Sequence, residues 1–129
     1  VDCSAMPDAV PALAAAACFA DGPTRLTGLS TLRVKESDRI ATVAGEWGRA
    51  GADIHIEGDD LIIRPQPLPD HPVTLQTWQD HRIAMGGAIL GLRRGGVSIA
   101  DPGCTAKSYP GFWADLARFA ADAPSGDNA

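Results

Sequence analysis

Two stretches of the chain, residues 36–50 and 111–121, show the apolar periodicity of amphipathic helices. Their apolar side chains recur every three or four positions and therefore share one helical face. They are Ile40, Val43, Ala44 and Trp47 in the first stretch, and Phe112, Trp113, Leu116 and Phe119 in the second. Two further stretches, residues 9–20 and 83–92, are apolar on every side, which predicts helices that are buried all round.

Short extended segments are predicted between these helices, because apolar and β-branched runs are bounded there by glycine, proline and aspartate. The predicted strands span residues 1–4, 24–29, 52–57, 60–64, 73–78 and 97–100. Gly58-Asp59 separates two of them and is typical of a tight hairpin turn. We expect the first segment to be the end of a longer strand. The order is β-α-β-α-β-β, followed by β-α-β-α.

The two parts of this order resemble copies of one βαβαββ unit, which predicts an α/β fold with an internal repeat. The first unit covers residues 1–66 and the second covers residues 67–122, followed by a flexible tail at 123–129. The charged residues support the repeat, because Lys107 follows Asp80 at the same spacing at which Lys35 follows Asp8. Two unrelated βαβα patterns are the alternative. The second copy lacks the closing hairpin, so we expect a segment outside this sequence to complete its sheet.

Composition narrows the class of protein. The 129 residues are 45% hydrophobic and carry a net charge of −5, which argues against a nucleic-acid or anionic-membrane surface. The apolar stretch at residues 9–20 is shorter than the roughly 20 residues of a membrane span. Three cysteines without metal-ligand or redox spacing favour a reduced, cytoplasmic protein. Aromatic residues make up only 5%, so we expect small side chains and closely packed elements in the core.

Charged side chains gather at four predicted junctions between a strand and a helix. They are Asp8, the run Lys35-Glu36-Ser37-Asp38-Arg39, the triplet Asp80-His81-Arg82, and Lys107. Helix N-termini attract anions, and the lysines and arginines would make the common rim a strongly cationic cup. The carboxylates could exchange protons with a bound ligand. Lys35 and Arg39 would share a helical face if their helix starts early.

Each cluster also has a simpler interpretation. The run from Lys35 to Arg39 is also consistent with a solvated first helical turn. Asp80 could be only a helix N-cap, and Asp8 only an acid in a first helical turn. The three histidines are scattered, so we expect no metal site. The functional interpretation depends on all four junctions facing one end of the fold.

The junction motifs resemble the C-terminal portion of the 5-enolpyruvylshikimate-3-phosphate (EPSP) synthase family. They are Leu32 to Ile40 with Lys-Glu-Ser-Asp-Arg, Asp80-His81-Arg82-Ile83-Ala84-Met85, Cys104-Thr105-Ala106-Lys107-Ser108-Tyr109-Pro110, and Ser4-Ala5-Met6-Pro7-Asp8. The resemblance extends from about Asp2 to Phe119. It implies an enolpyruvyl transferase-type inside-out α/β barrel of βαβαββ units around buried helices, of which this chain supplies two, the second incomplete.

The resemblance also implies a reaction, in which the enolpyruvyl group of phosphoenolpyruvate passes to the 5-hydroxyl of shikimate 3-phosphate. This step belongs to the shikimate pathway of aromatic amino acid biosynthesis and is the target of glyphosate. The resemblance implies no metal or organic cofactor. The catalytic residues would be Asp8, which deprotonates the hydroxyl, Lys35 beside it, and the proton-transfer residue Glu36. The substrate-binding residues would be Arg39, Arg82, Lys107, His81 and Thr31, where Thr31 replaces the asparagine of some members.

The resemblance further implies a missing partner, because the N-terminal portion of the family supplies further anion-binding groups and a closing lid. We therefore expect the isolated chain to have negligible turnover. Two alternatives remain open. The first is a related enolpyruvyl transferase that acts on a UDP-sugar, and the second is a non-catalytic module that binds an anion or serves only in folding.

Overall fold

The computed structural model describes residues 1–122, without the side chains of Lys107, Ala121 and Asp122. The predicted flexible tail therefore lies outside the described residues. The helices are α1 (Val10–Ala17), α2 (Arg39–Arg49), α3 (His81–Arg94) and α4 (Phe112–Asp122), with 3₁₀ turns η1 (Pro7–Ala9), η2 (Ser30–Val34) and η3 (Pro102–Lys107). The strands are β1 (Thr24–Leu26), β2 (Asp53–Glu57), β3 (Asp60–Arg64), β4 (Val73–Leu75) and β5 (Val97–Ile99).

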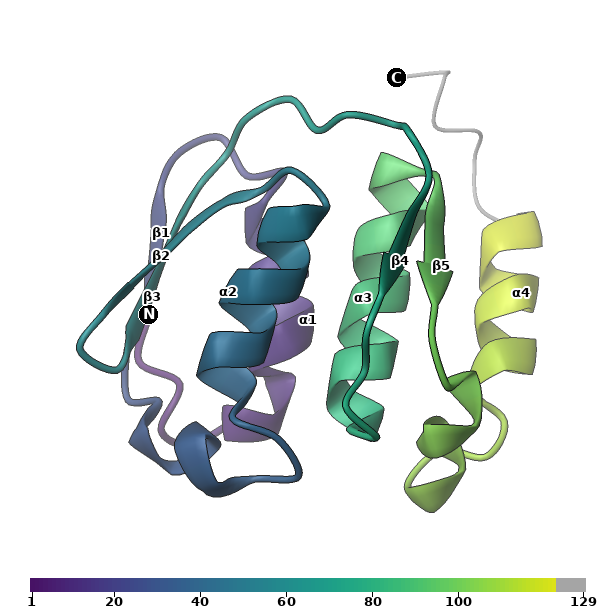
Figure 1. The fold of residues 1–129 in the computed structure, drawn as a ribbon, viewed down its shortest axis with the longest axis horizontal. Coiled ribbons are helices and arrows are strands. Elements are labelled where there is room, and N and C mark those ends of the chain that lie inside the picture. The colour runs from purple at the N-terminus through teal and green to yellow at the C-terminus, as the bar shows by residue number, and fades with distance from the viewer. Residues whose placement is uncertain (123–129) are drawn as a thin grey trace.

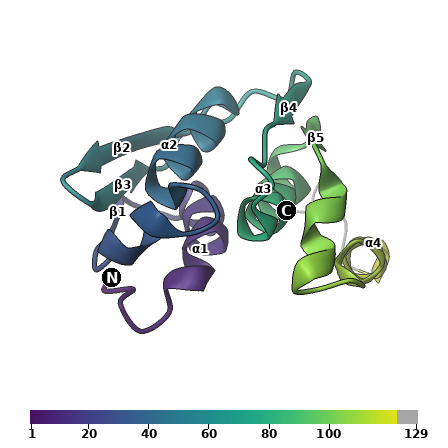
Figure 2. The ribbon, with the colours of Figure 1, turned by 60° about the horizontal axis from the view of Figure 1, so that its bottom comes forward.

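Two small sheets enclose a layer of helices (Figures 1 and 2). The first sheet has the order β1-β3-β2, in which both neighbouring pairs are antiparallel, and the second pairs β4 with β5 in parallel. Helices α1, α2 and α3 lie between the sheets, whereas α4 lies beyond β5. No helix within residues 1–122 is long and apolar enough to cross a membrane.

The repeated order of elements is visible in the strand pairing. Asp2 forms a parallel bridge with Thr27, and the first segment donates from the Cys3 amide to the Thr27 carbonyl at 2.8 Å. The parallel pair of β4 and β5 holds the corresponding place in the second sheet. On its other side, β1 pairs with β3. Strand β5 has no such second neighbour among the described strands.

Several predicted boundaries were wrong, and local backbone chemistry explains why. Helix α2 begins at Arg39 instead of residue 36, because the Asp38 side chain caps it by accepting the Ala41 amide at 3.1 Å. The strand predicted at 73–78 ends at Leu75, because Trp78 and Gln79 turn the chain with φ of 55° and 59°. Asp80 then caps α3, which therefore starts at His81 and continues to Arg94.

The core depends on close helix packing, as the small apolar side chains predicted. Helices α1 and α3 pack directly against each other, and a Cβ atom added at Gly86 would lie 2.8 Å from the Cβ of Pro11 and 3.0 Å from the ring of Trp47. Trp47 itself is fully buried, together with Ile40 and Val43 of the same face of α2. The predicted apolar face of α2 is therefore the face that enters the core.

Replacing Gly86 with alanine should lower the free energy of unfolding by about 1–3 kcal/mol, because the new methyl group would overlap Pro11 and Trp47. Gly45→Ala is the matched control. Gly45 lies in α2 with open space around its Cα, so alanine should raise stability by up to about 1 kcal/mol through helix propensity. Urea unfolding followed by circular dichroism measures both variants. An unchanged stability for Gly86→Ala would contradict the close approach.

Candidate functional site

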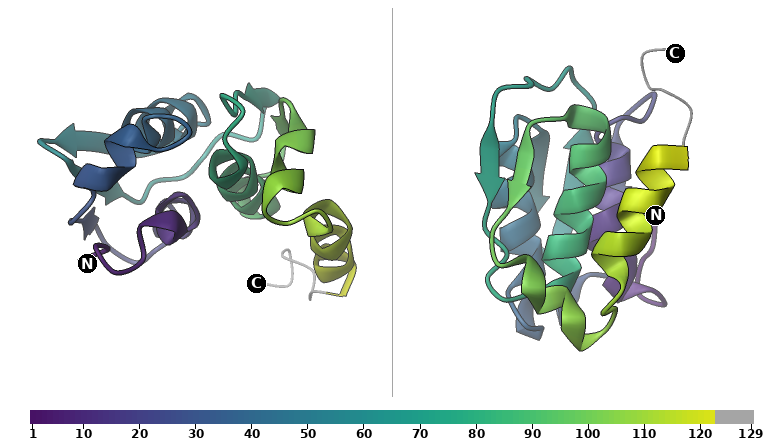
Figure 3. Two further views of the ribbon diagram at one scale, coloured as in Figure 1. Left: turned by 90° about the horizontal axis from the view of Figure 1, so that it is seen from below. Right: turned by 90° about the vertical axis from the view of Figure 1, so that its right-hand side faces the viewer.

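The four helices within residues 1–122 all begin at the same end of the molecule, the lower end in Figure 1. Figure 3 shows from the side that η3 and the start of α3 lie together at this end. The charged junctions seen in the sequence therefore share one rim. The partial positive charge of each helix N-terminus also points to that rim, which favours negative groups there.

The centre of the rim is an ion pair between Arg39 and Asp80, which are 1% and 0% exposed. Arg39 donates from Nε to Asp80 Oδ2 at 2.8 Å and from Nη2 to Asp80 Oδ1 at 3.1 Å, a two-pronged contact. Ser37 Oγ donates to the same carboxylate at 2.7 Å, and the Arg82 amide donates to it at 3.0 Å. Asp80 is thus both the cap of α3 and the buried partner of the first residue of α2.

Burial and hydrogen bonding act against each other on this pair. Burial would raise the pKa of Asp80, but the hydrogen bonds from Arg39 and Ser37 outweigh it, so the pKa is lowered. For Arg39, burial would lower the pKa, and the bonds to Asp80, Glu36 and Asp8 raise it instead. Both groups are therefore held in their charged forms.

Two further carboxylates occupy the outer side of the Arg39 guanidinium. Nη1 donates to Asp8 Oδ1 at 2.9 Å, and Nη2 donates to Glu36 Oε2. Both acids are partly exposed to solvent, unlike Asp80. Asp8 also lies 3.7 Å from Nη2 of Arg82, so this one carboxylate joins the two arginines. The predicted cationic cup is wrong in this respect, because the protein's own acids neutralise Arg39.

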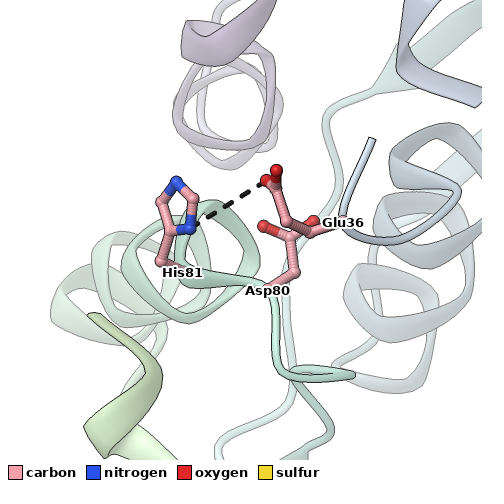
Figure 4. Close-up of side chains that lie close together, drawn as sticks. All are labelled: Glu36, Asp80 and His81. Carbon is pink, nitrogen blue, oxygen red and sulfur yellow. Dashed lines mark ion pairs between the residues drawn. The ribbon is translucent and has the colours of Figure 1, made fainter. Parts of the chain in front are cut away.

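His81 completes the inner cluster together with Glu36 and Asp80 (Figure 4). Its Nδ1 atom lies 4.0 Å from Glu36 Oε2, and the ligand-type atoms of the three residues lie within 4.8 Å of one another. Such a group could hold a metal ion, but both carboxylates already accept hydrogen bonds from Arg39. The positive guanidinium beside these carboxylates would weaken the binding of a metal ion there.

Two buried polar atoms in the first turn of α3 have no hydrogen-bond partner among the described residues. They are Nε of Arg82 and Nδ1 of His81. Buried polar groups in native structures normally have partners, and those without one need an explanation. The Arg82 side chain is partly exposed overall, and its Nη2 lies 3.7 Å from Asp8 Oδ2, whereas its Nε is buried.

The other predicted site residues are placed less centrally. Lys35 and Thr31 are exposed in and just after η2, and Lys35 precedes α2, so it does not share a helical face with Arg39. Lys107 ends η3, but its side chain lies outside the described part of the chain. The structure thus brings together Asp8, Glu36, Arg39, His81 and Arg82, and the roles of all eight residues stay predictions.

Sequence reasoning missed two polar residues of this cluster, Asp80 as a buried ion-pair partner and Ser37 as its hydrogen-bond donor. A helix N-cap is one of the two interpretations that the sequence gives for Asp80, and capping alone requires no buried ionic partner. Its true partner is 41 positions away in the sequence, so no local pattern could reveal it. Ser37 gave no signal beyond its place between two charged residues.

Comparison with known proteins assigns the chain to a family. The family model described as EPSP synthase (3-phosphoshikimate 1-carboxyvinyltransferase) matches residues 1–116. The chain belongs to the EPSP synthase family. The predicted family is therefore confirmed.

Curated relatives and solved structures agree with this assignment. The 3-phosphoshikimate 1-carboxyvinyltransferase of Methanoculleus marisnigri is 47% identical over 116 residues, which are 90% of this chain and 27% of the relative. That of Rhizobium etli is 41% identical over 91% of this chain and 29% of the relative. A solved EPSP synthase from Acinetobacter baumannii superposes with a TM-score of 0.75 at 38% identity, over 86% of this chain and 26% of that one. The predicted fold class is confirmed, and the chain spans about a quarter of the length of these relatives.

Asp80→Asn should lower the free energy of unfolding by about 3 kcal/mol at neutral pH, because it leaves the buried Arg39 with a weaker partner while keeping a side chain that can cap α3. Asp8→Asn is the matched control. It removes a carboxylate from the same guanidinium at an exposed position and should cost about 1 kcal/mol or less. Urea unfolding measures both costs.

The cost of Asp80→Asn should also depend on pH. Because folding lowers the pKa of Asp80, its carboxylate stabilises the fold fully above the ordinary value of about 3.9. This stabilisation is lost as the pH falls through the lower pKa of the folded state. The stability difference between the unsubstituted chain and Asp80→Asn should therefore narrow below about pH 4. An equal difference at neutral and strongly acidic pH would contradict the assigned direction.

Proposed function

We propose that this chain supplies part of the active site of an enzyme that transfers the enolpyruvyl group of phosphoenolpyruvate to the 5-hydroxyl of shikimate 3-phosphate, with release of phosphate. The observation that carries the proposal is the convergence of Arg39 and Arg82 on Asp8, in a chain that belongs to the EPSP synthase family. Two arginines and several helix N-termini at one rim suit a small molecule with a carboxylate and a phosphate.

The partners of Arg39 fall into a fixed inner group and a displaceable outer group. Asp80 is buried and holds the Nε side of the guanidinium, so it stays in place when a ligand arrives. Asp8 and Glu36 are partly exposed and hold the outer side. The carboxylate of phosphoenolpyruvate would replace one or both of these acids on Arg39 and would also pair with Arg82.

This exchange would prepare the two outer acids for their predicted roles. Once displaced from Arg39, Asp8 can accept the proton of the substrate hydroxyl, and Glu36 can exchange a proton with the enolpyruvyl group. His81 lies 4.0 Å from Glu36 and can orient it. Arg82 and the helix N-termini would stabilise negative charge on the leaving phosphate or the carboxylate, where desolvation strengthens their effect.

The comparisons favour this reaction over the UDP-sugar alternative, because the curated relatives cited above carry the name 3-phosphoshikimate 1-carboxyvinyltransferase. A non-catalytic module is disfavoured by the arrangement of carboxylates and arginines around one exposed rim. Binding of phosphoenolpyruvate, inhibition by glyphosate and a cytoplasmic location stay part of the proposal. So does the contribution of a further portion corresponding to the remaining length of the relatives.

A chimera tests the proposal directly. Residues 1–116 would replace the matching segment of the Acinetobacter baumannii EPSP synthase, and phosphate release would be measured with phosphoenolpyruvate and shikimate 3-phosphate. We expect turnover with shikimate 3-phosphate and none with UDP-N-acetylglucosamine. A chimera that folds and melts like its parent but releases no phosphate would refute the proposed function.

Within this chimera, Arg82→Ala should lower kcat/KM by about 100-fold, because it removes an arginine that pairs with the anionic substrate. Arg93→Ala is the matched control, since Arg93 is exposed near the opposite end of the same helix and stacks on Phe19. It should leave kcat/KM within about twofold of the unsubstituted chimera. Equal effects of the two substitutions would remove Arg82 from the substrate site.

The isolated 129-residue chain should release no measurable phosphate from the same substrates. Its rim is exposed to water, and relatives about four times as long supply the rest of the matched fold. Without a closed, water-excluding site, charge stabilisation of the transition state is weak. Product formation by the purified chain alone would contradict this expectation.

A further inference from the structure

Arg33 makes three directed hydrogen bonds that tie two distant parts of the chain together. Its Nη1 donates to Asp38 Oδ2 at 3.0 Å, its Nε to Asp59 Oδ1 at 3.1 Å, and its Nη2 to the Gly58 carbonyl at 3.0 Å. Arg33 lies in η2, Asp38 caps α2, and Gly58-Asp59 is the tip of the hairpin between β2 and β3. The guanidinium therefore uses all three of its nitrogens on structural partners, and the bond and ion pair with Asp38 and Asp59 raise its pKa.

The segment that Arg33 closes carries two predicted catalytic residues. Lys35 and Glu36 lie between the end of η2 and the start of α2, with Arg33 before them and Asp38 after them. The ion pair between Arg33 and Asp38 thus links the two sides of this short loop. The other oxygen of Asp38 accepts the Ala41 amide at 3.1 Å, so a single carboxylate fixes both the loop and the first turn of α2.

The hairpin tip gives this loop a rigid reference point. Strand β3 is the central strand of its sheet, and its residues Leu61, Ile62 and Ile63 are buried. Arg33 thereby connects the sheet to the loop that carries Glu36, the residue that pairs with Arg39. The loop's other bonds, from Ser37 to Asp80 and from Arg39 to Glu36, hold its C-terminal part.

We propose that Arg33 is a positioning residue that holds the 35–37 loop so that Glu36 and Lys35 keep their places at the rim. This inference rests on the proposed function only for its effect on turnover. The alternative is an ordinary surface ion pair, which contributes little to stability and nothing to the loop.

Arg25 provides a matched control for that alternative. It donates to Asp60 Oδ2 at 3.0 and 2.9 Å and lies 3.7 Å from Glu57, so it also pairs with two acids of the same hairpin. It lies on β1, and its hydrogen bonds go to Asp60, not to the 35–37 loop. Both arginines pair with acids of the same hairpin, but of the two only Arg33 also pairs with Asp38 at the end of the loop.

Amide NMR spectra of the 129-residue chain test the positioning role directly. In Arg33→Gln, the amide shifts of Lys35, Glu36 and Ser37 should move and their heteronuclear NOE values should fall, whereas Arg25→Gln should leave these three signals unchanged. Arg33→Lys should restore the loop only in part, because a point charge cannot reach three separate acceptors. If Arg33→Gln proves too unstable, Asp59→Asn should produce smaller changes at the same amides. Unchanged loop signals in both Arg33→Gln and Asp59→Asn would overturn the proposal.

Turnover in the chimera separates this proposal from the proposed function. Arg33→Gln should lower kcat by about 10-fold, because a displaced proton-transfer group costs rate. Arg25→Gln should leave kcat unchanged. A kcat drop equal in both variants would assign Arg33 a purely structural role. An inactive unsubstituted chimera would count against the proposed function alone, since the loop signals would still report on the positioning role of Arg33.

Discussion

The buried ion pair of Arg39 and Asp80 is the constraint on which the rim depends. It joins the first residue of α2 to the cap of α3, and so connects the two βαβ repeats at the end where all helices begin. A carboxylate at a helix N-terminus is favoured by the helix dipole, but an arginine there is not. The arginine of α2 therefore needs acidic partners, and Asp80, Glu36 and Asp8 surround it. Acids from three junctions thus compensate the charge of one buried guanidinium.

This coupling means that stability and ligand binding cannot be separated at Arg39. Truncating Arg39 would leave Asp80 buried without its main partner, which is strongly destabilising whatever Arg39 does for a ligand. Loss of anion binding in such a variant would therefore carry no functional information. Arg82 is different, because it is partly exposed and its Nε has no partner among the described residues. Under the proposed function, removing Arg82 should therefore affect ligand binding more than stability.

Local sequence patterns predict most helices and strands, whereas the burial of the site residues depends on partners that are distant in the sequence. The apolar face of α2, with Ile40, Val43 and Trp47, and the hairpin at Gly58-Asp59 follow from periodicity and turn chemistry alone. The start of α2 was misplaced although Asp38 is a good capping residue, because the acidic residue before it resembled a first turn. The burial of Asp80 could not be predicted, since its partner comes from another repeat.

The sequence suggests a cationic rim, and the structure compensates the charge of Arg39, its buried arginine, with acids of the chain itself. A buried arginine with unused donors would carry a large desolvation cost, so its charge has to be compensated within the chain. Asp8 and Glu36 provide that compensation from positions exposed enough to be displaced. Under the proposed function, a ligand carboxylate would exchange one ion pair on Arg39 for another. Under the proposed function, further affinity would come from groups that are not fully paired without ligand, such as Arg82, whose Nε has no partner among the described residues.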